Sequence, residues 1–240
     1  MKRNSNTPII IAIFAAGILA LVGLIFASLI LNHQKQVNYD DYNFNSYIGP
    51  NEFNGEIGDH VKGNKDKAKV FIVEYADFQC PGCASLNNYV NKIPEKFNDE
   101  VGVIYRNYIM TYHQNGTAAA CAAEAAGLQG YWQKMGDLLF SNQASWQYAD
   151  IDERTDYFVS YFKTASNGEG DVDKFKNDMN SRAVNKKIKF DQDIADRIDV
   201  PGTPSLYLNG ERLDYSSTKT EDEFFKFLHD KIDPLLKDSK

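Results

Sequence analysis

The chain is short of cysteine and of basic residues. Its three cysteines in 240 residues are too few for a scaffold held by several disulfides, although two of them can pair and leave one over. The 26 basic residues are outnumbered by 33 acidic ones, and the net charge of −7 argues against a nucleic-acid partner, which would need a basic face. With 43% hydrophobic and 25% charged residues, the chain is neither disordered nor collagen-like. We expect one domain with additions or two small ones.

Long apolar runs are also absent, with one exception at residues 9–31. These 23 residues carry no charge, and a helix of that length spans about 34 Å, enough for a hydrocarbon core of about 30 Å. A cleaved signal peptide is the alternative, but its apolar region is shorter and ends in a small-x-small site. Ala27-Ser28-Leu29 has leucine where a small residue should lie. The sequence therefore predicts an uncleaved anchor across residues 8–31.

Charges on the two sides of this run predict its orientation. Lys2 and Arg3 precede it, whereas His33 and Lys35, and then Asp40 and Asp41, follow it. The excess of positive charge before the run places the N-terminus in the cytoplasm. We therefore expect a single-pass protein of the cell membrane with its main domain outside the cytoplasm, where conditions are usually oxidising and disulfides persist. The exported part would contain all 33 acidic residues.

Residues 32–60 are rich in Asn, Asp, Tyr and Gly and have no sustained hydrophobic period. This composition predicts a flexible or loosely packed spacer, whose aromatic residues are able to dock on the domain.

A βαβ unit follows the spacer. Residues 69–78 form a near-continuous apolar and β-branched run, which is typical of a strand buried on both faces. A helical pattern begins near Pro81 and includes Pro94, which should kink the helix. Residues 101–110 read as a second strand, so we expect the two strands to lie parallel in one sheet.

The second half begins with a helical block and ends with a hairpin and a helix. Strand signals return at residues 204–208, and Asn209-Gly210 is a strong hairpin signal before a partner strand at 211–214. Thr220 and Glu223 have the spacing of a capping box that opens the last helix. The expected helices of the block are 117–128, 131–140, 153–163, 172–179 and 184–198.

The pair Cys80-Pro81-Gly82-Cys83 carries the chemistry. A cysteine at a helix start is favoured as a thiolate by unpaired N–H groups and the helix dipole. A second cysteine three residues on lies within disulfide reach, so the pair can cycle between dithiol and disulfide. A structural disulfide is one alternative. A zinc site is another, but it needs four ligands and would have to recruit His113 and Cys121, because there is no second Cys-x-x-Cys.

Three further positions are candidates for function. Glu74 lies inside the buried strand, and a buried carboxyl group that is protonated near neutral pH can shuttle protons to a thiol; the alternative is an edge position facing solvent. Pro204 can open a strand because proline is tolerated at a first strand residue, but sequence does not reveal whether the Thr203–Pro204 bond is cis. Cys121 lies among alanines in a predicted helix, which favours a small buried residue over a regulatory thiol.

Together these segments resemble the DsbA-like thiol–disulfide oxidoreductases of the thioredoxin superfamily. The resemblance covers about residues 58–236 and rests on Phe78-Gln79-Cys80-Pro81-Gly82-Cys83, the Ala-rich stretch 118–127 followed by Leu138-Leu139-Phe140, and Gly202-Thr203-Pro204.

The resemblance implies a role for each candidate. Cys80 would be the exposed nucleophile and Cys83 the buried resolving thiol, while Thr203 and Pro204, joined by a cis bond, would pack against the pair and bind substrate backbone. Glu74 matches the buried acidic position of the superfamily. Two features depart from the family: the dipeptide Pro-Gly lacks the histidine of the strongly oxidising members, and the family pattern does not require Cys121.

The expected fold is therefore α/β, a thioredoxin-like mixed sheet with an inserted all-helical domain, preceded by a transmembrane helix. The predicted parts are a cytoplasmic tail (1–7), the anchor (8–31), the spacer (32–60), the first part of the thioredoxin-like domain (61–112), the helical insertion (113–198) and the second part of the domain (199–240).

The expected function is disulfide formation in reduced exported proteins, with a membrane or extracellular redox partner that resets the cysteine pair. We expect contact with the lipid bilayer through residues 8–31, no nucleic-acid partner, no cofactor and no metal. A reductase or isomerase of the same fold is one alternative, since the dipeptide has no histidine. A non-catalytic binding or assembly module on this fold is another.

Overall fold

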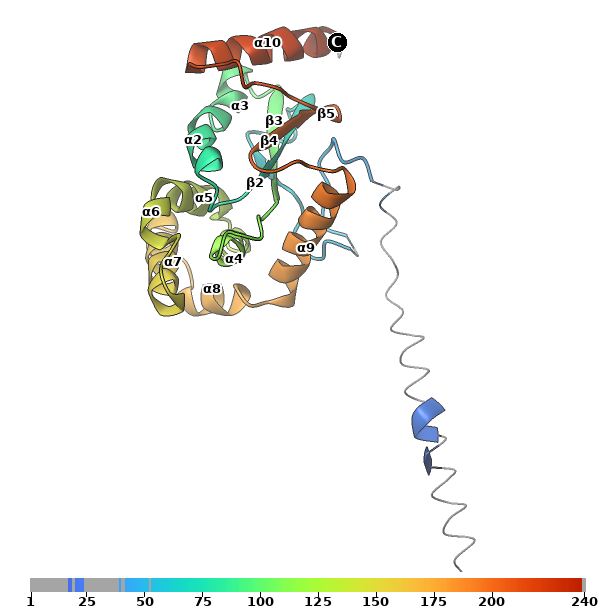
Figure 1. Ribbon diagram of the computed structural model, residues 1–240, viewed down its shortest axis with the longest axis vertical. Helices are drawn as coiled ribbons and strands as arrows, with labels where there is room; N and C mark the ends of the chain where they lie inside the picture. The colour runs from blue at the N-terminus through green and yellow to red at the C-terminus, as the bar shows by residue number, and fades with distance from the viewer. Residues whose placement is uncertain (1–16, 19, 24–38, 40–41, 52, 239–240) are drawn as a thin grey trace, which may run out of the picture. The chain divides into compact units, whose positions relative to one another are not determined.

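The computed structural model describes residues 17–18, 20–23, 39, 42–51 and 53–238 (Figure 1). In the unit that begins at residue 40, a five-stranded mixed sheet has the strand order β1-β3-β2-β4-β5. The strands are β1 (His60–Lys62), β2 (Val70–Ala76), β3 (Val101–Asn107), β4 (Ser205–Leu208) and β5 (Glu211–Arg212).

The central pair β2 and β3 is parallel and lies in register from Val70 opposite Val101 to Ala76 opposite Asn107. Both strands are almost wholly buried, as their apolar runs predict, but each ends earlier than expected and leaves its last residues in a loop. The crossover contains α2 (Pro81–Val90) and α3 (Ile93–Lys96).

The expected kink at Pro94 is a complete break between α2 and α3. Proline has no N–H group to donate and is best tolerated in the first turn of a helix, which is the place that Pro94 takes in α3.

The predicted helical block is confirmed, and it includes one short helix, α6, that the sequence pattern did not reveal. Several helices begin at a side chain that accepts a hydrogen bond from the backbone N–H three residues on: Asp150 before α7, Asp171 before α8 and Ser181 before α9. The helices are α4 (Gly116–Gly127), α5 (Trp132–Ser141), α6 (Gln143–Trp146), α7 (Ile151–Ala165), α8 (Val172–Asp178) and α9 (Arg182–Arg197).

The hairpin and the capping box are also present. Asn209 and Gly210 both have positive φ (50° and 86°), as the two-residue turn requires. Thr220 Oγ1 accepts from the Glu223 N–H, and Glu223 Oε2 accepts from the Thr220 N–H, both at 3.2 Å. This box opens α10 (Glu221–Asp238), which runs across the top of Figure 1.

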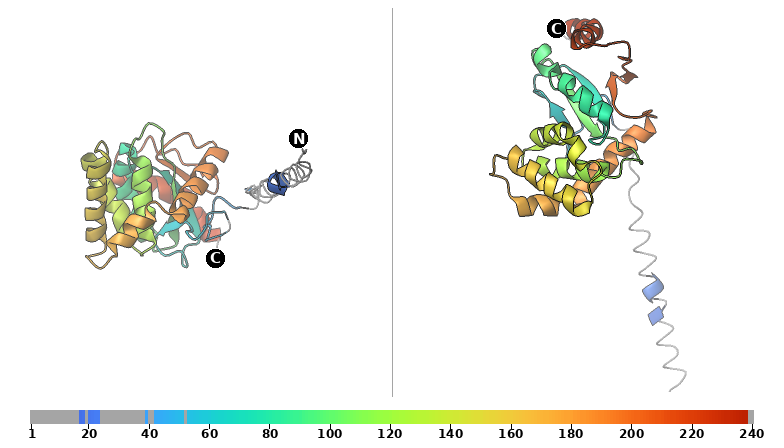
Figure 2. Two further views of the ribbon diagram at one scale, coloured as in Figure 1. Left: turned by 90° about the horizontal axis from the view of Figure 1, so that it is seen from below. Right: turned by 60° about the vertical axis from the view of Figure 1, so that its left-hand side comes forward.

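The two faces of the sheet have different surroundings. On one face, Val70 and Ile72 share an apolar cluster with side chains of α2, α3 and α10. The other face contacts α9, the helix to the right of the sheet in Figure 1. Figure 2 shows α4 between α9 on one side and the group α5, α6 and α7 on the other. Of these helices, α5, α7 and α9 are in contact with α4.

The end of the predicted spacer differs from the expectation. Ile48 and Ile57 are buried, the ring of Tyr42 packs edge-on against that of Phe190 at 5.6 Å, and β1 adds residues 60–62 to the sheet. The low hydrophobicity of this segment did not predict that it packs on the domain, because buried polar groups make many of its contacts.

The predicted anchor at 8–31 lies mostly outside the described residues. Among the residues that the structure does describe, no helix is long and apolar enough to cross a membrane.

Candidate active site

The two cysteines lie where β2 gives way to α2. After Ala76, the loop of Asp77, Phe78 and Gln79 leads to Cys80, which is the N-cap of α2 in an extended conformation, with Pro81 in the first turn. Proline suits that position because its missing N–H would have no helical partner there. Cys80 is 8% exposed and Cys83, one turn further, is fully buried. Only the first sulfur can meet another molecule.

The surroundings divide the two thiols into a thiolate and a thiol. Hydrogen bonds from the side chain of Cys83, from that of Thr203 and from the N–H groups of Cys83 and Gly82 lower the pKa of Cys80 to about 5, although partial burial opposes this. Burial, followed by the neighbouring Cys80, raises the pKa of Cys83 well above its ordinary value. At neutral pH Cys80 is therefore a nucleophile and a good leaving group, while Cys83 keeps its proton.

The Thr203–Pro204 segment lies directly against this pair. Its peptide bond is cis, and the Thr203 carbonyl oxygen lies 3.2 Å from Cys80 Sγ. A Cβ atom added to Gly82 would lie 3.0 Å from Pro204 Cδ and 3.6 Å from Cys80 Sγ, so the proline ring packs on bare backbone. The structure thus brings together four of the five predicted site residues: Cys80, Cys83, Thr203 and Pro204.

Glu74, the fifth, is fully buried on the face of the sheet that α2 covers. This excludes the solvent-facing alternative. Neither of its carboxylate oxygens has a hydrogen-bond partner among the described residues, and Lys62 Nζ lies 3.6 Å from Oε2. Lys62 in turn donates to Asn87 of α2 at 2.8 Å. After burial and Cys80, the charge of Glu74 is a further cause of the raised pKa of Cys83, so the carboxylate is close enough to influence that thiol.

The third cysteine has a different environment. Cys121 is buried in α4, and burial raises its pKa to about 11. A thiol with that pKa stays protonated and unreactive at neutral pH. Among the residues with described positions, no cluster of three or more His, Cys, Asp or Glu is arranged to hold a metal ion, and His113 pairs with Asp77.

Comparison with known proteins identifies the family to which this chain belongs. The family model for thioredoxin matches residues 56–230. The chain belongs to the thioredoxin family. The inserted helices between β3 and β4 give it the DsbA-like form of that fold.

Solved structures share this form at low sequence identity. Oxidised BdbD from Bacillus subtilis has a TM-score of 0.60 and 18% identity, covering 80% of this chain and 100% of that one. Wolbachia pipientis α-DsbA1 has a TM-score of 0.56 and 22% identity, covering 75% and 92%. The catalytic domain of Proteus mirabilis ScsC has a TM-score of 0.57 and 15% identity, covering 72% and 88%.

Curated relatives are longer proteins. The chain is 31% identical over 157 residues to a protein named Na(+)/H(+) antiporter NhaA 1 from Mycolicibacterium gilvum, covering 64% of this chain and 24% of that protein. A protein of the same name from Salinispora arenicola is 35% identical over 155 residues, covering 64% and 22%. The chain therefore spans about a quarter of the length of these relatives.

Sequence reasoning missed three residues around the cysteines. Gly82 admits the proline ring, Lys62 approaches Glu74 from β1, and Asp77 anchors the loop before Cys80. A polar residue directly after a buried strand is a signal that could have drawn attention to Asp77. Lys62 lay in a segment that gave no strand signal.

Proposed function

We propose that this chain is a membrane-anchored, extracytoplasmic thiol–disulfide oxidoreductase that forms disulfides in reduced exported proteins. The enzyme class follows from the thioredoxin family and the cysteine pair; the direction, the substrates and the compartment are the proposed part. The observation that carries the direction is the low pKa of Cys80, about 5, beside the high pKa of Cys83. A stabilised thiolate stabilises the reduced form, which makes the disulfide a better oxidant.

The proposed reaction uses the Cys80–Cys83 disulfide as the electron acceptor. A client thiolate attacks Cys80 Sγ, and the bond to Cys83 breaks, so Cys83 leaves as a thiolate and takes up a proton because burial raises its pKa well above the ordinary value. A second client thiolate then attacks the client sulfur of the mixed disulfide and releases Cys80 as a thiolate. Two electrons move from the client to the cysteine pair, and the client gains one disulfide. A membrane or extracellular redox partner must then remove these electrons.

The packing around Cys80 provides the binding site for that reaction. Pro204 covers Gly82 beside the sulfur, and the Thr203 carbonyl oxygen lies 3.2 Å from Cys80 Sγ. Backbone groups of an extended client segment would lie along Thr203 and Pro204 while its cysteine reaches Cys80.

The test uses the purified full chain in its disulfide form. We expect it to oxidise a reduced, unfolded protein with a stoichiometry of one disulfide per chain, and to have a reduction potential closer to about −120 mV than to about −270 mV. In intact cells, alkylation should find the pair mainly oxidised. A potential near the lower value, with a mainly reduced pair in cells, would instead favour the reductase or isomerase alternative.

The anchor needs a separate test. The uncharged run of 23 residues and the preceding Lys2 and Arg3 support a cytoplasmic N-terminus with residues 8–31 in the membrane. After alkaline washing of membranes, the full chain should stay in the pellet, whereas a chain without residues 1–31 should be released. A mature protein whose N-terminus begins after residue 31 would show that the segment is a cleaved signal.

A further inference from the structure

The main chain of Asp77 contacts both cysteines. Its carbonyl oxygen accepts from the Cys80 N–H at 3.0 Å. Burial dominates the raised pKa of Cys83, and a hydrogen bond from the backbone of Asp77 acts in the opposite direction. Movement of this one residue would therefore displace the partners of both sulfur-bearing residues at once.

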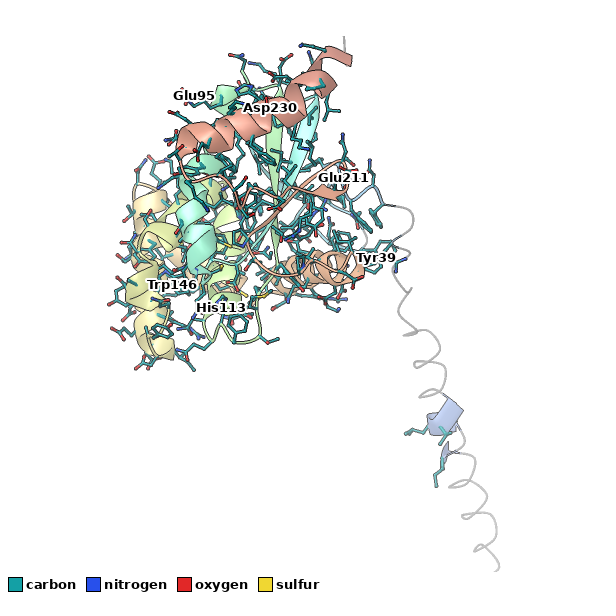
Figure 3. The ribbon with its side chains drawn as sticks, turned by 45° about the horizontal axis from the view of Figure 1, so that its top comes forward. Tyr39, Glu95, His113, Trp146, Glu211 and Asp230 are labelled. Atoms are coloured by element: carbon teal, nitrogen blue, oxygen red, sulfur yellow. The ribbon has the colours of Figure 1, made fainter. Side chains whose placement is uncertain are left out.

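The side chain of Asp77 is held in a built pocket. It is 1% exposed; Oδ1 accepts from the Gln79 N–H at 2.8 Å, and Oδ2 accepts from the Met110 N–H at 2.9 Å. Oδ2 also lies 2.7 Å from Nδ1 of His113, which is labelled in Figure 3 at the loop before α4. A Cβ atom on Gly116 would lie 3.0 Å from Oδ1, so the carboxylate fits against a bare glycine at the start of α4.

The next two residues of the active-site loop are held from the same side. The Phe78 carbonyl accepts from the Gln143 side chain at 2.8 Å. Gln79 accepts from the Asn115 N–H at 2.7 Å and donates to the Gln147 carbonyl at 2.9 Å. Every residue between β2 and Cys80 is thus hydrogen-bonded to the helical insertion or to the loop that leads into it.

We infer that Asp77 is a positioning residue for the thiol–disulfide exchange: its carboxylate locks the β3–α4 loop to the active-site loop and so fixes where Cys80 and Cys83 lie relative to each other. The inference rests on the proposed function, and it gives the helical insertion a part in that reaction. A loop that only connected β2 to α2 would need no buried carboxylate. Here one carboxylate holds three donors from two loops, and its own backbone holds the cysteines.

The experiment compares Asp77→Ala and Asp77→Asn with Asp137→Asn in the full chain. Asp137 is a matched control because it also ties α2 to the insertion, accepting from Asn87 and Asn91 at 3.0 and 2.8 Å, yet its backbone contacts neither cysteine. The first readout is the pKa of Cys80, from the ultraviolet absorbance of its thiolate. The second is the rate at which the oxidised chain reacts with reduced glutathione.

For Asp77→Ala we expect the pKa of Cys80 to shift by about one unit or more and the rate to fall by about tenfold to 100-fold, the scale of a misplacement near 1 Å. Asp77→Asn should show a smaller change of the same sign, and Asp137→Asn should leave both readouts unchanged. If Asp77→Ala does not fold, His113→Gln removes one of the three side-chain contacts and should shift the pKa in the same direction by less.

Unchanged thiolate titration in folded Asp77 variants, or an equal change in Asp137→Asn, would overturn the inference. The titration needs no client protein. A wild-type chain that fails to oxidise clients would therefore contradict the proposed function while the positioning role of Asp77 is still measured.

Discussion

Cys83→Ser should hold the protein in a covalent complex with its clients, whereas Cys80→Ser should abolish exchange entirely. The reason lies in the division of roles between the two sulfurs. Cys80 is the partly exposed member of the pair, with a pKa of about 5, and Cys83 is fully buried. In the Cys83→Ser chain the Cys80 thiolate attacks a disulfide of a client, and one client sulfur leaves as a thiolate. A serine at position 83 cannot then displace the client from Cys80, so the mixed disulfide persists. A serine at position 80 leaves no thiolate that a client can reach.

The measurement is non-reducing electrophoresis of the full chain isolated from cells after rapid alkylation. The Cys83→Ser chain should migrate with clients in bands that disappear on reduction, and the Cys80→Ser chain should not. Cys121→Ser is the matched control. Cys121 is as little exposed as Cys80, but burial raises its pKa to about 11. It should exchange as the wild type does. Client complexes that survive in Cys80→Ser, or that depend on Cys121, would contradict the assignment of the nucleophile.

The cysteine pair was predictable because its chemistry depends on local order along the chain. A buried strand followed at once by Cys-x-x-Cys and a helical period places a sulfur at a helix start, whatever the rest of the fold does. The hairpin at Asn209-Gly210 and the capping box at Thr220 are equally local. Local signals of this kind located β2 to β5, and the helices from α2 to α10 except α6, within a few residues of their bounds.

The parts that sequence did not reveal depend on partners far apart in the chain. Arg106 lies within an apolar strand, and its partners Phe44 and Ser46, 62 and 60 residues earlier, accept its hydrogen bonds through their carbonyl groups. Nothing in the local composition of that earlier segment shows that it must meet a buried guanidinium. Its low hydrophobicity therefore predicts a spacer, although it completes a polar cluster in the folded chain.

That cluster lies under the sheet face that contacts α9. Arg106 Nη2 lies 2.8 Å from Asp59 Oδ2, and Lys187 Nζ lies 3.0 Å from Asp59 Oδ1 and 2.5 Å from Asp191 Oδ1. All four side chains are almost or fully buried. Lys187 is shared by two carboxylates that come from distant parts of the chain, so its charge keeps the segment before β1, the sheet and α9 together.

Lys187→Met should therefore be strongly destabilising. Breaking a buried ion pair by removing one partner costs about 3–5 kcal/mol, because the remaining charge stays buried and unpaired. This is a large part of the roughly 5–15 kcal/mol that keeps a typical domain folded. Lys189→Met, two residues further along α9, is the matched control. Its ammonium is exposed and pairs with Asp193 at 2.7 Å, so it should cost less than about 1 kcal/mol. Urea unfolding of both variants at neutral pH measures the difference.

The destabilisation by Lys187→Met should depend on pH if it comes from the lost charge beside Asp191. Burial raises the pKa of Asp191 to about 6 even though Lys187 opposes it. A carboxyl group whose pKa is higher in the folded state makes the fold less stable as pH rises from about 4 to about 6. Without Lys187 the pKa of Asp191 in the folded state rises further. The pH range over which the fold loses stability then extends to higher pH. We therefore expect the cost of Lys187→Met to be larger at pH 8 than at pH 5, where Asp191 is mostly protonated and needs no cation. A cost that is the same at both pH values would contradict the part assigned to Asp191. The loss would then come from the pair with Asp59, whose pKa Lys187 and Arg106 lower to about 2 against the effect of burial, or from packing of the lysine stem.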